Sequence, residues 1–265
     1  MKLCLGWAAV LLPAALLAQP QIGGGQCSSS TLNGNYSLSL SGRQMSQASS
    51  SGATVLGFKG ALQGIGSASF DGQNKITITL ANNTNSATGT AQTWSGTYTL
   101  QANCTGTVTL TGNETATFTL GAYDSGATYF LDGYDGTYSF TGSGTSLPAT
   151  CSASLLNGTY AFNGNGFVLN SGAIGTVNAI SGILTFDGTN AATGNWYVSI
   201  AGGTQNTVTT GAFTVTSNCT ASATLSDTSG NKYSLQMVIT APKGTNFILS
   251  GASPSIMFSG SGRTL

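Results

Sequence analysis

Residues 96–110 read GTYTLQANCTGTVTL, and residues 211–225 read GAFTVTSNCTASATL. In both stretches, two runs of alternating apolar and hydroxyl side chains flank an Asn-Cys-Thr turn. Alternation with a period of two predicts a strand with one buried side and one side facing solvent. A hairpin of this kind that occurs twice, with one cysteine in each turn, predicts a duplicated antiparallel β-protein.

The duplication extends over most of the chain. Three further landmarks recur in the same order: a Cys that leads into an Asn-Gly pair (27–34 and 151–158), a Phe-Asp-Gly turn (70–72 and 186–188) and a closing Phe-x-Gly-x-Gly segment (140–144 and 258–262). Four landmarks in one order indicate tandem copies. We therefore expect the following division: signal peptide 1–18, flexible leader 19–26, β-domain 27–144, linker 145–150 and second β-domain 151–265.

The strand pattern predicts an all-β fold. Each copy contains about eight alternating runs separated by Gly and Asn/Asp turns, which suits an up-and-down meander. Eight such strands close naturally into a small barrel and so remove exposed sheet edges. We expect two tandem antiparallel up-and-down β-barrel-like domains, with two β-sandwiches as the alternative. One outer-membrane barrel made from both copies is disfavoured, because the runs are shorter than the roughly ten residues such strands require.

The N-terminus and the cysteines indicate export. Lys2 precedes an apolar run and a small-residue cleavage site after Ala18, as in a secretory signal peptide. Cys4 would leave with this segment, and an even number of cysteines would remain in an oxidising compartment. The repeat favours pairing Cys27 with Cys104 and Cys151 with Cys219. A zinc site is disfavoured, since the chain has no His and no C-x-x-C motif.

The composition excludes several classes of function. Without Lys2, six basic residues stand against seven acidic ones, and the basic residues are scattered singly. A nucleic-acid surface needs clustered Lys and Arg, so we expect no nucleic-acid partner. No later apolar run is long enough to span a bilayer as a helix, so we expect no transmembrane segment after signal cleavage. The expected location is periplasmic, cell-surface or extracellular.

The sequence contains few residues that could perform catalysis. The absence of His excludes Ser-His-Asp and Cys-His arrangements. Asp71 and Asp187 sit in equivalent Asp-Gly turns, where an Asp caps its own backbone. Asp132 and Asp135 have no counterpart in the second copy, and with Asp124 they would suit a calcium site or a carboxylate pair for glycoside hydrolysis. Asp-Gly turns explain Asp132 and Asp135 as well. We therefore expect no enzymatic activity and no cofactor.

Binding is the better supported role. A barrel lined by apolar side chains could hold a small apolar molecule, with the polar segment from Arg43 to Gly52 at its mouth, although the same side chains could fill the barrel as core. Trp94 and Trp196 occupy non-equivalent positions in the two copies. If exposed they could stack on a glycan, and if buried they would belong to the core.

The motifs at 27–36, 70–72 and 96–106 resemble a group of exported bacterial β-repeat proteins, rich in Gly and Thr, whose function is uncharacterised. More loosely, the chain resembles lipocalin-like or calycin barrels, although Tyr36 and Tyr160 stand where the lipocalin Gly-x-Trp signature has Trp. The resemblance implies a barrel fold and a lumen. We expect a non-enzymatic secreted or surface-associated protein that binds a small apolar ligand or a glycan. A structural or adhesive surface role and a carboxylate-dependent glycoside hydrolase are the alternatives.

Overall fold

The computed structural model describes eight stretches of the chain: residues 26–44, 62–84, 87–88, 91–111, 115–134, 138–170, 173–200 and 202–265. Most of these residues lie in antiparallel strands. The expected signal peptide, and the expected loop beyond Gln44, lie outside the described residues.

The first copy forms a barrel in which the long strands pair in chain order and β1 pairs with both β2 and β9. A two-residue strand, β4, extends the edge of β3. The strands of this barrel are β1 (Asn33–Gln44), β2 (Leu62–Asp71), β3 (Lys75–Thr84), β4 (Ala87–Thr88), β5 (Gln92–Leu100), β6 (Thr105–Thr111), β7 (Thr115–Tyr123), β8 (Thr128–Tyr134) and β9 (Tyr138–Thr145).

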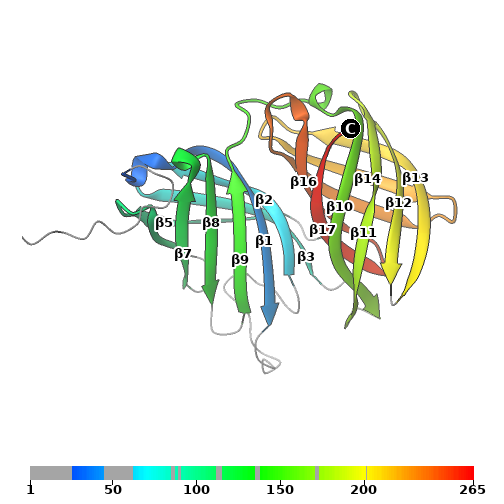
Figure 1. Cartoon of the computed structure of the whole chain (residues 1–265), viewed down its shortest axis with the longest axis horizontal. Helices are drawn as coiled ribbons and strands as arrows, with labels where there is room; N and C mark the ends of the chain where they lie inside the picture. The colour runs from blue at the N-terminus through cyan, green and yellow to red at the C-terminus, as the bar shows by residue number, and fades with distance from the viewer. Residues whose placement is uncertain are drawn as a thin grey trace, which may run out of the picture.

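The second copy forms a closed eight-stranded barrel of the same topology, in which β10 pairs with β11 and β17. Its strands are β10 (Asn157–Asn170), β11 (Ala173–Asp187), β12 (Ala191–Ile200), β13 (Gly203–Val215), β14 (Thr220–Asp227), β15 (Lys232–Ile239), β16 (Asn246–Ala252) and β17 (Ile256–Thr264). Figure 1 shows the two barrels in tandem. The expectation of two tandem barrels is confirmed, and neither the sandwich nor one combined barrel is formed.

The two disulfides are those that the repeat predicts. Cys27 is bonded to Cys104 and Cys151 to Cys219, with Cα–Cα distances of 5.0 and 4.9 Å. Cys104 and Cys219 both have positive φ angles, 64° and 68°, in the Asn-Cys-Thr turns. Disulfides of this kind are typical of oxidising compartments, in agreement with export.

The Asp-Gly turns are also as expected. Asp71 Oδ1 accepts three backbone N–H bonds of 2.8 to 2.9 Å from residues 73–75, and Asp187 Oδ1 does the same with residues 189–191. These bonds favour the charged carboxylate. The hydroxyl of Thr189, together with the backbone donors, lowers the pKa of Asp187 to about 2.

Side chains fill both barrels. Most of the inward residues are apolar and form one buried cluster per barrel, around Phe70 and Tyr98 in the first and around Phe186 and Trp196 in the second. The cavity beside Trp94 in the first barrel measures about 10 Å³, enough for at most one water. The described residues therefore leave no room in this lumen for the small apolar ligand that we considered.

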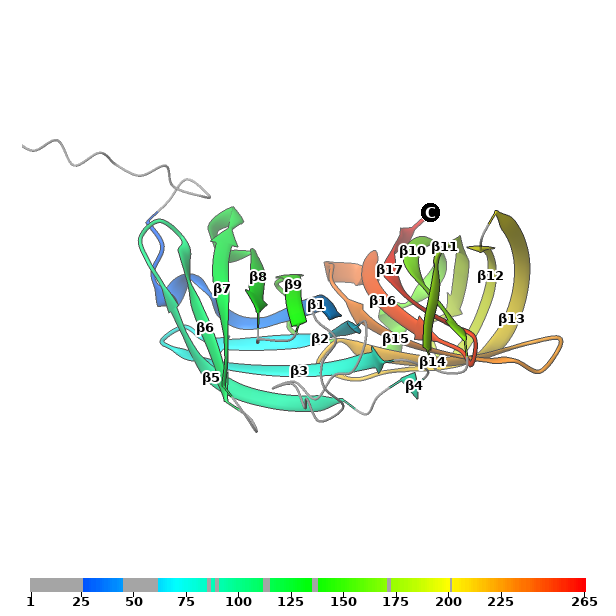
Figure 2. The same ribbon diagram turned by 90° about the horizontal axis from the view of Figure 1, so that it is seen from below.

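The two barrels also pack against each other. Contacts join β2 of the first barrel to β15, β16 and β17 of the second, as Figure 2 shows from below. On these strands, Ile65, Val238 and Met257 point away from their own barrels, yet at most 2% of each side chain is exposed. None of the three belongs to either core cluster. A small apolar interface therefore holds the barrels side by side.

Candidate functional site

The outer wall of the second barrel carries ordered rows of side chains. Residues directly opposite each other on neighbouring strands point to the same side of a sheet. One row runs through Ser261, Asn163, Ser181, Tyr197 and Asn206, on β17, β10, β11, β12 and β13. The next row runs through Ser259, Asn165, Ala179, Ser199 and Thr204 on the same strands. This wall presents hydroxyl and amide groups around one tyrosine.

This wall forms one side of a groove between the barrels. The groove has a volume of about 750 Å³ and receives Ser39 and Ser143 from the first barrel. Near it, Gln63 of the first barrel donates a hydrogen bond of 3.3 Å from Nε2 to the backbone oxygen of Asn165 in the second barrel. The groove thus exists only because the two copies are packed together.

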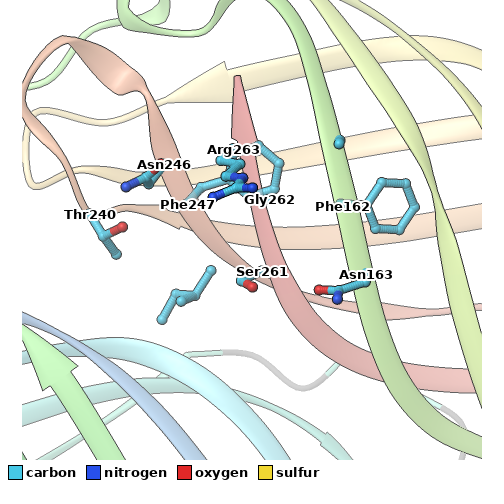
Figure 3. A pocket seen from close by; sticks show the side chains of 10 residues that line it. Phe162, Asn163, Thr240, Asn246, Phe247, Ser261, Gly262 and Arg263 are labelled. Atoms are coloured by element: carbon cyan, nitrogen blue, oxygen red, sulfur yellow. The ribbon is translucent and has the colours of Figure 1, made fainter. Parts of the chain in front are cut away.

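A second pocket adjoins this groove. It measures about 600 Å³ and shares Asn163, Ile248 and Ser261 with the groove. Figure 3 shows the side chains of Asn246 and Arg263 close together on β16 and β17, with Ser261 and Asn163 lower in the view. The groove and the pocket therefore form one continuous surface, which we call the inter-barrel groove.

The described residues that line the inter-barrel groove are mostly neutral and polar. Its side chains supply hydroxyl and amide donors and acceptors, which remain neutral at any physiological pH. Tyr197 is half exposed and offers a flat ring with a polar tip. Among the described residues that line either part, Arg263 is the only charged one.

The tryptophans belong to the core. Trp94 is 7% exposed and Trp196 is 1% exposed, so the hypothesis that they stack on a glycan is wrong. A Cβ atom on Gly194 would lie 2.2 Å from the ring of Trp196. In the first copy, Ile78 and Trp94 occupy the places of Gly194 and Thr209, so the indole of Trp196 compensates for the smaller residues beside it.

The acidic candidates do not form a site in the described residues. Asp132 is exposed on β8 between Thr119 and Thr141, and Asp124 lies in a turn, where the hydroxyl of Thr128 donates to it at 3.5 Å. Among the described residues, no three metal-binding side chains come together. Asp135 lies outside the described residues, as does the side chain of Arg43, and both stay untested.

The second barrel buries polar atoms without partners. Asn178 and Thr209 are each 1% exposed, and among the described residues the Asn178 amide, the Thr209 hydroxyl and the indole N–H of Trp196 have no hydrogen-bond partner. By register, Leu62 and Trp94 stand in the first copy where Asn178 and Thr209 stand in the second. An unpaired buried polar group costs about 1–3 kcal/mol.

Sequence reasoning missed the residues of the groove wall, although the sequence contains a signal for them. At outward positions, the second copy has Asn163, Tyr197 and Asn206 where the first has Ser39, Ala81 and Ala91. These outward-facing differences are not found when the two copies are compared only for acidic residues, tryptophans and insertions. The same comparison applied to every outward position would have found them.

The described residues contain no helix that is long and apolar enough to cross a bilayer. No protein-family model matches the chain, and no curated protein matches it. Among solved structures, the chain is similar to a candidate outer membrane protein from Bacteroides fragilis (TM-score 0.25, 13% identity, 89% of this chain and 99% of that chain). It is also similar to a protein of unknown function of the DUF3598 family from Nostoc punctiforme (TM-score 0.25, 8% identity, 88% of this chain and 97% of that chain). At these TM-scores the two likenesses establish nothing about the function of the chain.

Proposed function

We propose that the protein is an exported, non-enzymatic binding protein that holds a glycan in the inter-barrel groove. The observation that carries this proposal is the lining of the groove, where a half-exposed tyrosine stands among neutral amide and hydroxyl side chains. A sugar presents hydroxyl groups that both donate and accept hydrogen bonds, together with apolar C–H faces. The groove matches both properties.

Three cross-strand neighbours supply the binding chemistry. Tyr197 lies directly opposite Ser181 on β11 and Asn206 on β13. Neighbouring strands are about 4.8 Å apart, so a hydroxyl and an amide flank the ring on both sides. A sugar stacked on the ring would therefore find hydrogen-bonding partners for its equatorial hydroxyls.

The lumen of the first barrel does not compete for this role. The first barrel offers a cavity of about 10 Å³, whereas the groove offers about 750 Å³, in the range of ordinary ligand sites. This difference supports a glycan in the groove over an apolar molecule inside a barrel.

A glycan microarray probed with the full-length exported protein tests the proposal. The informative variant is Tyr197→Ala, and the matched control is Tyr134→Ala, because Tyr134 has a similar exposed fraction, 58% against 50%, but lies on β8 of the first barrel. Buried aromatic anchors often contribute more than 1.4 kcal/mol, which is a factor of about ten in Kd.

We expect Tyr197→Ala to weaken every positive glycan about tenfold or more, and Tyr134→Ala to leave binding unchanged. Equal binding by the two variants would place the site elsewhere. A wild-type protein that binds no glycan on a broad array would overturn the proposal.

A further inference from the structure

The two copies differ sharply at one pair of outward positions. In the first copy, Ser37 and Thr145 occupy these positions and bond to each other. The Thr145 N–H donates to Ser37 Oγ at 2.9 Å, the two hydroxyls lie 3.3 Å apart, and Ser37 is only 2% exposed. In the second copy, the equivalent pair is Ala161 and Arg263, which face each other across β10 and β17.

This exchange opens the pocket of the second copy. Alanine has no polar atom to bond its neighbour and leaves space above the sheet, and a cavity of about 600 Å³ lies over Ala161 and Arg263. Arg263 itself is exposed. In the described part of the chain, no carboxylate forms an ion pair with it. The exchange therefore replaces a satisfied hydroxyl pair with an unneutralised cation in a pocket.

The neighbours of Arg263 favour an anionic group. Asn246 lies directly opposite it on β16, and Ser261 stands two residues before it on the same face. A guanidinium group presents several N–H donors in a plane that fits the two oxygens of a carboxylate. The amide of Asn246 and the hydroxyl of Ser261 can donate to the same oxygens.

From this geometry we infer that the pocket at Arg263 is a subsite for an acidic sugar, so that the glycan in the inter-barrel groove carries a uronate carboxylate. The inference rests on the proposed function and names its substrate class. Arg263 and Tyr197 are three strands and one row apart, about 15 Å along the sheet. This separation suits a short oligosaccharide that occupies both places at once.

The charge balance of the chain supports the inference. Only 5% of the residues are charged, so the position of Arg263 in the groove does not simply reflect a surface rich in charges. The described residues of the groove include no other cation. The selectivity for acidic over neutral glycans would therefore depend on this one residue.

Titration calorimetry on the full-length protein tests the inference with matched probes. The probes are a cello-oligosaccharide and the corresponding oligoglucuronan, and a galacto-oligosaccharide and the corresponding oligogalacturonate. Each pair differs in having a C6 hydroxymethyl or a C6 carboxylate. The variants are Arg263→Gln and, as the control that removes a cation of the same barrel outside the groove, Lys232→Gln.

We expect at least one uronate to bind tenfold or more tightly than its neutral partner. Arg263→Gln should remove this difference, and Lys232→Gln should keep it. Raising NaCl from 50 to 500 mM should weaken the uronate and leave the neutral probe unchanged, because salt screens exposed charges.

Other outcomes separate the two proposals. If neutral and acidic probes bind equally and Tyr197→Ala weakens both, the glycan function stands and the acidic subsite is overturned. If Arg263→Gln weakens neutral and acidic probes alike, Arg263 has only a structural role and the inference fails. If no probe of either kind binds, both proposals are overturned.

Discussion

Thr209→Val should stabilise the second barrel, although most core substitutions destabilise a protein. Thr209 is 1% exposed and its hydroxyl has no partner, so the folded state bears a desolvation cost of about 1–3 kcal/mol. Valine has the same shape and replaces the hydroxyl with a methyl group. The ring of Trp196 and the bare backbone of Gly194 lie beside this position, so the methyl group would face apolar neighbours.

The expected gain is about 1–3 kcal/mol in the free energy of unfolding, or a rise in Tm of at least roughly 4 °C for a domain of this size. Guanidinium unfolding followed by tryptophan fluorescence measures it, since Trp196 lies 5.4 Å from Tyr233 inside the barrel and reports on its packing. Calorimetry gives Tm independently.

The matched control is Thr214→Val on the same strand. Thr214 is exposed, and its hydroxyl lies 3.0 Å from that of Ser222, so this substitution should change stability by less than about 0.5 kcal/mol. If Thr209→Val destabilises the barrel by 1 kcal/mol or more, the hydroxyl is satisfied in solution, for example by an ordered water. The reasoning from the unpaired atom would then be refuted.

Three further predictions concern the fold. Replacing Cys151 and Cys219 with Ser should cost about 4 kcal/mol in the chain-entropy model, since the bond closes a loop of 68 residues, and denaturant unfolding with and without reductant measures this. The pKa of Asp187 is lowered to about 2, so the contribution of this carboxylate to stability is complete above pH 4 and is lost as the pH falls towards 2. Acid unfolding of Asp187→Asn should lack this part of the pH dependence. Identical acid-unfolding curves for the wild type and the variant would contradict this prediction. Gly166→Ala should destabilise the second barrel by more than 1 kcal/mol, because the new Cβ would lie 1.8 Å from the backbone oxygen of Met257, and an unchanged Tm would show that the strands can separate.

The strands and turns could be predicted from the sequence because their causes are local. Alternation fixes which side chains of a strand share a face, and an Asp-Gly pair such as Asp187-Gly188 forms its turn from its own atoms. The disulfide pairing followed from the position of Cys104 and Cys219 in the repeat. The duplication added the long-range information that local patterns lack.

The groove could not be predicted in the same way, because it depends on which strands become neighbours. Tyr197 and Asn163 are 34 positions apart in the sequence and belong to one row only after β10, β11 and β12 pair in register. The interface had a fainter signal: Val238 lies in a run of three apolar residues, 237–239, within a strand of period two. Such a run indicates a strand that is buried on both faces.

The contact between the barrels also bears on whether a further copy could pack in the same way. Strand β2 of one copy covers β15–β17 of the other, which is a head-to-tail contact that could in principle continue into an open array. On the outer wall of the first barrel the residues that this contact requires are absent: Asp132 and Ser139 stand where Ser250 and Met257 are buried in the second barrel. A third barrel added by the same contact would have to bury the Asp132 carboxylate. Polar faces of this kind act as caps in repeat proteins, and here the face around Asp132 disfavours a further barrel packed through the same contact.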